Sequence, residues 1–590
     1  MSSTPASGTL RDNDGPSRPA LKEAPPYTAH VKTRWPLPQY AGALAHELRD
    51  TIEGEVRFDT GSRALYATDG SNYRQVPIGV VLPKSIDDVI TTVAACRRHG
   101  APVLSRGGGT SLAGQCCNVA VVMDFSKYMH GIIELDPRQK LAEVQPGCVL
   151  DHLRDAAERY ALTFAPDPST HTHNTLGGMI GNNSCGVHSI MGGRTSDNIQ
   201  ELDILTYDGL RLRVGPTPDY ELEAIIREGG RRGEIYLALK ALRDRYADLI
   251  RQRYPKIPRR VSGYNLDELL PENGFNVARA LVGSEGSCVV ILRAWVSLVD
   301  SPPVRSVLAL GYDDVFSAGD HVMEALSFKP IGLEGIDDGL IQDMKVIGLH
   351  PEDVALLPPG GGWLLVEFGG QTKAEADDKA HALMHALKQK SDAPSMKLFD
   401  DKAEEQMIWK VRESGLGATA HVPNKAITWE GWEDAAVPPE RLGSYLRDFR
   451  KLLDDYHYQG DLYGHFGQGC VHTRIDFDLE TQAGIDTFHR FLNDAADLVV
   501  RYGGSLSGEH GDGQSKAEFL SKMFGTELVQ AFSEFKAIWD PQGRMNPGKV
   551  VDPYPITSNL RVGPSYQPPK LKTHFAYPAD KGDFSRAVQR

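Results

Sequence analysis

Short apolar runs alternate with amphipathic segments along the chain from Ile78 onward. Residues 78–83 are mostly apolar and predict a buried strand. Residues 85–100 predict an amphipathic helix, because Ser85 is a suitable N-cap, two acids follow it and Gly100 ends the segment. Residues 101–107 predict a second strand, so the stretch is a β-α-β unit. Similar patterns predict strands at 118–125 and 141–147, helices at 151–161 and 233–254, and closing strands at 278–299.

The pattern changes after Pro302 and Pro303. Two apolar runs and two amphipathic segments then predict an antiparallel sheet covered by helices, with strands at 304–312 and 361–370 and helices at 320–327 and 373–390. The ends of the chain are rich in proline and polar residues and have little to bury. The predicted organisation is a disordered arm at 1–44, a first domain at 45–302, a second domain at 303–500, a segment at 501–550 that returns to the first domain, and a proline-rich tail at 551–590.

Composition narrows the class of protein. The 590 residues are too many for one core and predict two or three domains. The formal net charge of −14 argues against a nucleic-acid partner, which a basic patch would indicate. The seven cysteines are scattered and odd in number, which favours reduced thiols and a cytoplasmic location. No apolar run is long enough for a transmembrane segment, and a peripheral position at a membrane stays open.

Two glycine-rich stretches are candidate ligand-binding loops. Residues 105–111, followed by Gly114, come directly after a predicted strand, and glycines there let backbone N–H groups approach a diphosphate. The alternative is a tight turn, since the stretch matches neither the common dinucleotide motif nor the P-loop. Residues 166–186 are rich in small residues that cannot build a core but can wrap closely around a flat heterocycle. A shorter Gly-Ser-Glu-Gly motif lies at 283–286.

Histidines and a glutamate near the end of the second domain are candidate metal ligands. His465 and His472 are separated by a glycine-rich turn, so both imidazoles can face one ion. Glu509 and His510 are adjacent and flanked by glycines, so both can line one cavity, or Glu509 can bind the metal while His510 serves the substrate. Two histidines and one carboxylate suit Zn or Mn with open positions. The alternative is that these histidines are satisfied core residues.

Five motifs in a fixed order carry a resemblance to a known family: RGGGTSLAGQ, PDPST, TLGGMIGNNSCG, GRTSDNI and VGSEGS. Over about residues 45–550 the chain resembles the vanillyl-alcohol-oxidase-type flavoproteins, in the branch of FAD-linked D-lactate and D-2-hydroxyglutarate dehydrogenases. The resemblance implies an α+β fold, with a two-subdomain FAD-binding domain and a substrate or cap domain made of an antiparallel sheet and helices. It also implies non-covalent FAD, because the loop lacks the histidine that often carries covalent flavin.

The resemblance assigns residues to each role. The FAD-binding residues it implies are Arg106, Gly107, Gly108, Gly109, Thr110, Ser111, Gly114, Pro166, Thr175, Gly177, Gly178, Gly181, Asn182, Ser184, Gly186, Glu285 and Asn546. The metal ligands it implies are His465, His472 and Glu509. Gln468 and Cys470 depart from the family's Asp and Asn, which bears on the shape of the pocket and not on the ligands.

The implied reaction is the oxidation of a small D-2-hydroxy acid to the 2-oxo acid. His510 is the expected base, since a histidine needs little tuning at neutral pH. Arg412, in a W-x-x-R-E motif, is expected to bind the substrate carboxylate as a bidentate clamp, with a surface ion pair as the alternative. Lys425 lies near the family's second cation, and Arg474 would suit a diacid such as 2-hydroxyglutarate.

The resemblance allows more than one electron acceptor and more than one type of protein. The electron acceptor can be a quinone, an electron-transfer protein or an iron–sulfur partner on another subunit, because this chain has no clustered cysteines for a cluster of its own. One alternative enzyme is a flavin oxidase that uses oxygen. A flavin-binding scaffold without activity is a third possibility, but such a scaffold would not need Arg412, His465, His472, Glu509 and His510 together.

Overall fold

The structure is a computed structural model that describes residues 37–423, 425–566, 573–580, 582 and 584–589. It contains both helices and sheets, in keeping with the expected α+β class. Residues 1–36 of the predicted arm lie outside the described residues. The arm was predicted to extend to residue 44, and this is wrong: helix α1 (Ala41–Thr51) begins inside it and buries Leu44 and Leu48 against the first domain.

The first domain begins with a four-stranded sheet in the order β1-β2-β4-β3. Its strands are β1 (Glu55–Arg57), β2 (Gly79–Leu82), β3 (Val103–Arg106) and β4 (Val121–Asp124). β2, β4 and β3 run parallel, which a β-α-β crossover through α3 (Ile86–His99) requires. The hydroxyl of Ser85 accepts from the backbone N–H of Asp88, and Gly100 ends the helix in the left-handed region. The predicted N-cap and C-terminal glycine of this helix are therefore confirmed.

A five-stranded antiparallel sheet forms the second half of the first domain, in the order β5-β6-β10-β8-β9. Its strands are β5 (Ile132–Asp136), β6 (Leu141–Val144), β8 (Ile199–Leu205), β9 (Arg211–Val214) and β10 (Val290–Ser297). Helices α4 (Leu150–Glu158), α7 (Asp219–Glu228) and α8 (Gly230–Arg253) contribute to the same core. The prediction of strand throughout 278–299 is wrong at its start, where α9 (Val277–Leu281) forms because the Asn276 side chain caps the N–H of Arg279.

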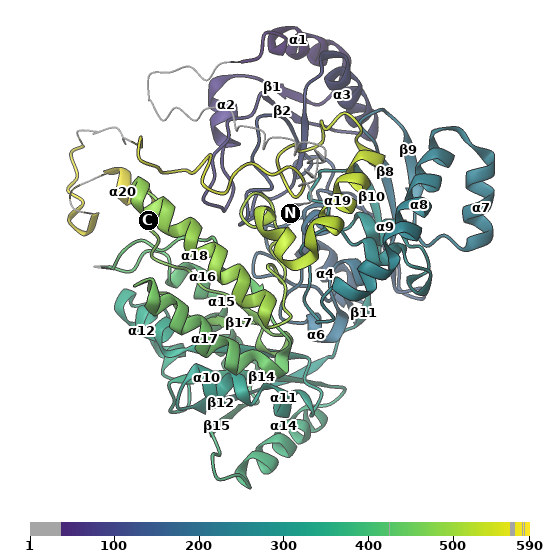
Figure 1. Ribbon diagram of the computed structural model, residues 1–590. Coiled ribbons are helices and arrows are strands. Elements are labelled where there is room, and N and C mark those ends of the chain that lie inside the picture. Colours follow the sequence, from purple (N-terminus) through teal and green to yellow (C-terminus); the bar gives the residue numbers. More distant parts are fainter. Residues whose placement is uncertain (1–36, 424, 567–572, 581, 583, 590) are drawn as a thin grey trace, which may run out of the picture.

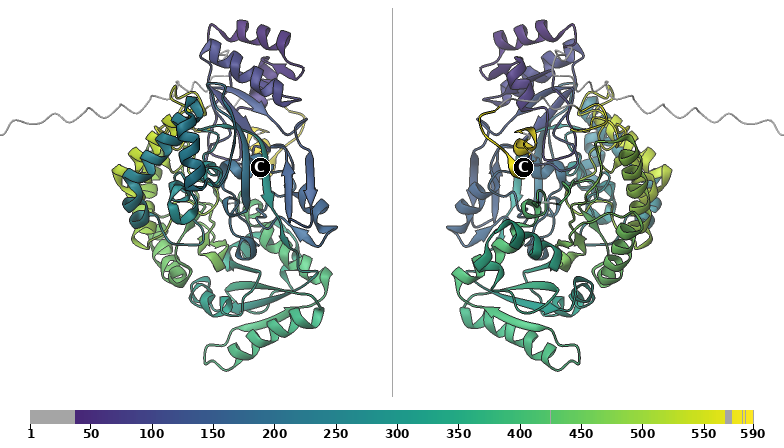
Figure 2. Two further views of the ribbon diagram at one scale, coloured as in Figure 1. Left: turned by 90° about the vertical axis from the view of Figure 1, so that its right-hand side faces the viewer. Right: turned by 90° about the vertical axis from the view of Figure 1, so that its left-hand side faces the viewer.

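The second domain is built on a five-stranded antiparallel sheet in the order β15-β12-β14-β13-β17 (Figure 1). Its strands are β12 (Val304–Tyr312), β13 (Gly332–Asp337), β14 (Gly362–Gly370), β15 (Ser395–Phe399) and β17 (Tyr463–Gly464). One face, with Leu308 and Leu310, packs on α10 (Val315–Asp320) and α14 (Lys373–Lys388). The opposite face, with Val307 and Ala309, packs on α12 (Asp338–Ile347) and α15 (Lys402–Glu413). Figure 2 shows α14 on the outer side of this sheet, away from the first domain.

The chain returns to the first domain after α17 (Leu442–Asp455) and α18 (Gln482–Arg501). Helix α19 (Leu520–Trp539) packs on α8, and Met545 bridges to Val103 of β3. The proline-rich tail predicted at 551–590 was expected to have little to bury, and this is wrong for residues 551–562, because Ile556 and Leu560 are buried and the carbonyl of Asn559 accepts from the N–H of Arg74. Among the described residues, no helix combines the length and apolar character needed to span a membrane.

Candidate active site

A cavity of about 470 Å³ lies between the first and second domains. The first domain contributes the loop after β3 and residues 167–188. The second domain contributes β14, α15 and the 463–472 segment, and the returning segment contributes Glu509 and His510. A smaller cavity of about 60 Å³ adjoins the first and shares Gly107, Thr175 and Asn182 with it. The two glycine-rich loops and the candidate metal ligands therefore face the same space.

The predicted FAD-binding residues fall into three groups. The larger cavity is lined by Gly107, Gly108, Gly109, Thr110, Ser111, Thr175, Gly178, Asn182 and Ser184. The smaller cavity adds Arg106, Gly177, Gly181 and Glu285. Four predicted residues line neither cavity, namely Gly114, Pro166, Gly186 and Asn546. These four lie outside the lining and support the cavity walls, and their contact with FAD stays a prediction.

The supporting residues have structural contacts of their own. A Cβ on Gly114 would lie 2.7 Å from the Tyr73 ring. Asn546 donates to the carbonyls of Gln115 and Glu285 and so connects the first glycine-rich loop with the motif at 283–286. Arg106 lines the smaller cavity, but its guanidinium donates to the carbonyls of Cys116 and Thr68 and stacks over Tyr66, so it holds the loop in place.

The glycines of the first loop allow two loops to pack together. A Cβ on Gly107 would lie 2.1 Å from the hydroxyl oxygen of Thr175, and a Cβ on Gly108 would lie 2.4 Å from the carbonyl oxygen of His173. Thr175 in turn caps α5 (Leu176–Asn182) by accepting from the N–H of Gly178. The sequence pattern favours a ligand's approach as the reason for these glycines, whereas in the structure they are required first by the contact between the two walls of the cavity.

The cavities suit the FAD that the fold family implies. Ser105 Oγ and Gln115 Oε1 are buried without a hydrogen-bond partner among the described residues, and both residues line the smaller cavity. Buried polar groups normally have partners, so these atoms are available to a polar ligand. A Cβ on Gly181 would meet its nearest atom only at 4.0 Å, which leaves room beside α5. The residues present therefore fit a bound dinucleotide.

The two candidate metal-binding histidines are brought together by a hairpin. Tyr463 and His472 exchange backbone hydrogen bonds, and Gly464 and Gly469 have positive φ values of 151° and 72° in the turn between them. The His465 and His472 rings then lie 4.9 Å apart at 85°. The glycine spacing in the sequence thus has a direct geometric consequence.

One oxygen of Glu509 lies at the centre of the histidine cluster. Its Oε1 lies 2.9 Å from His465 Nε2, 3.1 Å from His472 Nε2 and 3.6 Å from His510 Nε2. The pKa of the Glu509 carboxyl is held well below its usual range, because His465 and Arg259 outweigh the opposing effect of burial. An ionised carboxylate oxygen beside two imidazole nitrogens is a suitable donor set for Zn or Mn.

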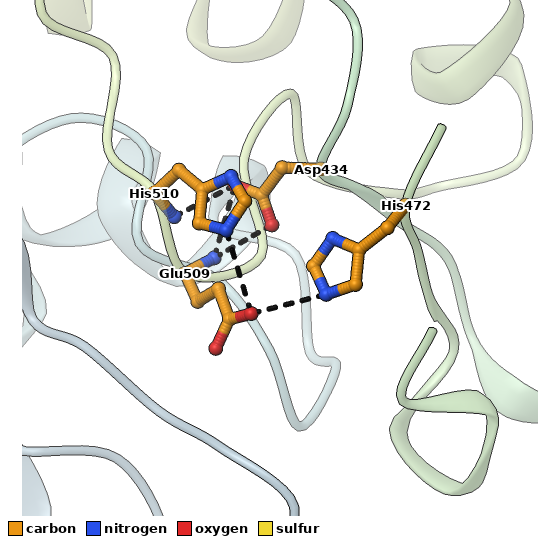
Figure 3. A group of neighbouring side chains, drawn as sticks. All are labelled: Asp434, His472, Glu509 and His510. Carbon is orange, nitrogen blue, oxygen red and sulfur yellow. Dashed lines mark hydrogen bonds and ion pairs between the residues drawn. The ribbon is translucent and has the colours of Figure 1, made fainter. Parts of the chain in front are cut away.

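Asp434 forms a second combination of donors with His472, Glu509 and His510, and one atom of each lies within 4.8 Å of the others (Figure 3). Asp434 is already saturated, however. Its carboxylate accepts from the backbone N–H groups of Glu509 and His510, and from the Ser507 hydroxyl. We therefore assign Asp434 to holding the Glu509–His510 loop, and the residues His465, His472 and Glu509 fit a divalent cation.

His510 has an environment that sequence analysis did not anticipate. Burial disfavours its charge, but Asp434, Glu433 and Glu509 outweigh burial and raise the pKa of His510 to about 10. Its ring stacks on His472 at 5.1 Å. The expectation that this histidine needs little tuning is thus corrected: the protein's carboxylates favour the protonated ring, and a cation bound to Glu509 would oppose them.

Only one of the three predicted substrate cations faces the cavity. Arg412 lines it, lies over the Tyr463 ring at 5.2 Å and has a buried Nε without a hydrogen-bond partner among the described residues. Lys425 does not line the cavity, because it pairs with Asp343. Arg474 also lies outside the lining, because its guanidinium is bound by Glu430 and by the carbonyl of Thr428. Both residues form ion pairs outside the cavity lining, so the structure gives no support for a contact of either with the substrate.

Three buried charged residues of the site escaped sequence analysis. Glu334 lies between His465 and Arg412, Arg259 contacts Glu509, and His188 lies between Asp167 and Glu367. Burial and charge balance identify them only once the fold is known. The pair Arg259–Arg260 stands out in the sequence solely as adjacent basic residues, which usually occupy a solvated surface.

Comparisons with known proteins identify two matched domains and several relatives. Residues 77–215 match the FAD binding domain family, and residues 301–550 match the C-terminal domain of FAD linked oxidases. The D-2-hydroxyglutarate dehydrogenase of Pseudomonas putida is 32% identical over 540 residues, which cover 89% of this chain and 53% of that protein. Glycolate oxidase subunit GlcD of Bacillus subtilis is 28% identical, over 85% of this chain and 95% of that protein.

Solved structures with a similar fold are also found. The structure of 4-ethylphenol oxidase from Gulosibacter chungangensis matches with a TM-score of 0.60 at 15% identity, covering 88% of this chain and 98% of that one. The fold is that of the vanillyl-alcohol-oxidase-type flavoproteins, and residues 77–215 form an FAD binding domain. The chain carries an FAD binding domain and the C-terminal domain of FAD linked oxidases, and over most of its length it is similar to D-2-hydroxyglutarate dehydrogenases. It spans about half the length of the D-2-hydroxyglutarate dehydrogenases that it matches.

Proposed function

We propose that this chain is an FAD-dependent dehydrogenase that oxidises a D-2-hydroxy acid, of the D-2-hydroxyglutarate or D-lactate class, to the 2-oxo acid. The observation that carries the proposal is the convergence of Glu509 Oε1 with His465 Nε2 and His472 Nε2 at 2.9 and 3.1 Å, in the same cavity as Arg412 and the glycine-rich loops. The D-2-hydroxyglutarate dehydrogenases among the relatives support the substrate class.

FAD, when bound along the two glycine-rich loops, would supply the acceptor for the hydride from C2 of the substrate. The residues for this binding are those that line the cavities, with Ser105 Oγ and Gln115 Oε1 as free polar atoms. No histidine is present in the loop 105–111, so the proposed attachment is non-covalent.

Zn or Mn, held by His465, His472 and Glu509, would lower the pKa of the substrate hydroxyl and orient it. Arg412 binds the adjacent carboxylate, because its planar fork matches two carboxylate oxygens. His510 exchanges the hydroxyl proton from its position beside His472 and Glu509. Its base role requires a neutral ring, which the neighbouring carboxylates oppose, so the pKa of His510 in the loaded site decides the pH dependence of the reaction.

A second carboxylate on the substrate would need a further cation. Lys410 and Arg305 also line the cavity, and Lys410 is exposed and forms no ion pair among the described residues. Arg305 lies 3.5 Å from Glu367, so part of its charge is already compensated. Lys410 is therefore the better candidate for the distal carboxylate of a diacid, in place of Arg474.

The test is an anaerobic absorbance titration of the purified chain with D-lactate, D-2-hydroxyglutarate and their L-isomers. We expect one D-isomer to bleach the oxidised-flavin spectrum, and prior removal of metal by a chelator to prevent the bleaching. A protein that contains no flavin contradicts the proposal, and bleaching by L-isomers alone contradicts the stereochemistry.

The electron acceptor is proposed to be a quinone, an electron-transfer protein or an iron–sulfur partner. The name of the GlcD relative, a glycolate oxidase subunit, supports a flavin subunit within a larger complex as an alternative to an independent enzyme. Stopped-flow reoxidation separates a dehydrogenase from an oxidase: slow reaction of the reduced flavin with oxygen supports the dehydrogenase, and reoxidation as fast as turnover supports an oxidase.

A further inference from the structure

Arg259 is a fully buried cation beside the histidine cluster, with no exposed side-chain surface. Its Nη1 donates to Glu509 Oε2 at 2.8 Å, and its Nε donates to Gln468 Oε1 at 2.7 Å. Its Nη2 donates to the carbonyl of Gly186. A single guanidinium therefore connects the Glu509 loop, the 463–472 hairpin and the second glycine-rich loop.

The two oxygens of the Glu509 carboxylate consequently have different surroundings. Oε2 accepts from Arg259, whereas Oε1 faces the Nε2 atoms of His465 and His472. The planar guanidinium allows little rotation of the carboxylate, because it is itself held at Gln468 and Gly186. Oε1 alone is thus presented to the space between the imidazoles.

Gln468 keeps the charge of Arg259 directed at Glu509. The Gln468 side chain is neutral, and Glu509 is the only carboxylate that pairs with Arg259 within the described part of the chain. A carboxylate at position 468 would divide the cation between two anions. The amide accepts the Nε–H without competing for the charge.

We propose that Arg259 is a positioning residue that makes Glu509 a one-oxygen ligand and thereby keeps cation positions open for the hydroxyl and carboxylate of the substrate. The inference rests on the proposed metal-assisted function. It assigns to Arg259 a role in substrate binding, although Arg259 is absent from the residues that line the cavity.

The experiment measures the affinity of the FAD-loaded protein for zinc. It then measures the affinity of the zinc-loaded protein for oxalate, a chelating acid that the enzyme cannot oxidise. We expect Arg259→Gln to bind zinc as tightly as the parent or more tightly, since both Glu509 oxygens become available and a nearby positive charge is lost. Oxalate affinity of the zinc-loaded variant should fall about tenfold or more, the range typical of groups that orient metal ligands. Arg259→Lys keeps the positive charge but loses the planar guanidinium. Its oxalate affinity should lie between those of the parent and Arg259→Gln.

Arg260→Gln is the matched control. Arg260 is the adjacent residue, is also buried and forms an ion pair with Asp267 at a distance of 2.7 Å, and neither residue lines the cavity. This variant should leave zinc and oxalate affinities unchanged. If Arg259→Gln lowers the zinc and oxalate affinities by the same factor, or changes neither affinity, Arg259 is merely structural and the inference is overturned.

A structure of the zinc-loaded parent chain provides a test that does not depend on a variant folding. Glu509 should bind zinc through Oε1 with Oε2 still on Arg259, and two-oxygen ligation overturns the inference. Failure of the parent chain to bind zinc overturns the metal site itself, so failure of the proposed function and failure of this inference are distinguishable.

Discussion

Oε1 of Glu334 lies 2.8 Å from Nδ1 of His465, deep in the second domain. The second oxygen of the same carboxylate lies 2.7 Å from Nη2 of Arg412. Glu334 is fully buried in β13, and its carboxyl pKa is lowered because His465 and Arg412 outweigh burial. One carboxylate therefore fixes the ring of a proposed metal ligand and the guanidinium of the proposed substrate clamp, so the two functions are coupled.

Glu334→Gln should weaken both functions while retaining the shape of the side chain. We expect zinc affinity to fall about tenfold, because the orienting charge on His465 is lost, and the KM for the D-2-hydroxy acid to rise as well. Zinc affinity is measured by competition with a chromogenic chelator. Glu367→Gln is the control, since Glu367 is a buried carboxylate of the adjacent strand that contacts His188 and Trp409 instead. Equal zinc affinities for the two variants would contradict the coupling.

The substrate's second carboxylate should depend on Lys410 and not on Arg474. Lys410→Gln is expected to raise the KM for D-2-hydroxyglutarate about fivefold relative to that for D-lactate, which corresponds to about 1 kcal/mol for an exposed charge pair. Arg474→Gln should leave this ratio unchanged but lower the free energy of unfolding by about 3 kcal/mol, because Glu430 remains buried without its partner. Steady-state kinetics with both substrates check the first expectation, and a selective effect of Arg474→Gln would refute it.

His188 should make stability depend on pH above neutrality. Burial disfavours its charge, but Asp167 and Glu367 outweigh burial and raise its pKa from 6.5 to about 9. A raised histidine pKa adds stability that is complete below the unfolded value and is lost as the pH rises through the folded value. The contribution of His188 to the free energy of unfolding should therefore fall by about 3 kcal/mol between pH 6.5 and 9.

Chemical denaturation of the parent chain and His188→Gln at both ends of that range measures the effect. The variant should be less stable at the lower pH and should lose less stability on going to the higher one. His489→Gln is the control, because His489 is 40% exposed beside Glu518 and contributes little as a surface pair. An identical pH dependence in the parent and His188→Gln would show that His188 does not supply the effect.

Local periodicity in the sequence was sufficient for the main elements of the fold. The strands β2, β12 and β14 and the helices α3 and α14 carry their own start, stop and burial patterns. The short helix α9 could not be predicted in this way, because five residues carry too little periodicity and its cap at Asn276 depends on tertiary position. The packing of residues 551–562 likewise depends on a surface made by distant segments.

The residues of the candidate site likewise fall into those that a local pattern identifies and those that only the fold brings together. His465, His472, Glu509 and Arg412 belong to motifs, so the sequence identified them. The partners that hold them are far away in the chain: Arg259 lies 250 residues before Glu509, and Glu334 lies 131 residues before His465. No spacing rule connects such pairs. The position of Lys425 and Arg474 outside the cavity lining has the same origin, since Asp343 and Glu430 pair with them through contacts that only the fold creates.

Gly107→Ala should release FAD from an otherwise folded protein. The added Cβ would lie 2.1 Å from Thr175 Oγ1, so the first glycine-rich loop must move away from the second. Both loops line the cavities, and we expect FAD affinity to fall at least tenfold, measured from the flavin absorbance retained after gel filtration. Gly42→Ala is the control: its Cβ would meet nothing within 4 Å in α1, and the change should add about 0.5–1 kcal/mol of stability with FAD retained. Full FAD retention by Gly107→Ala would mean that contact between the loops does not shape the cofactor site.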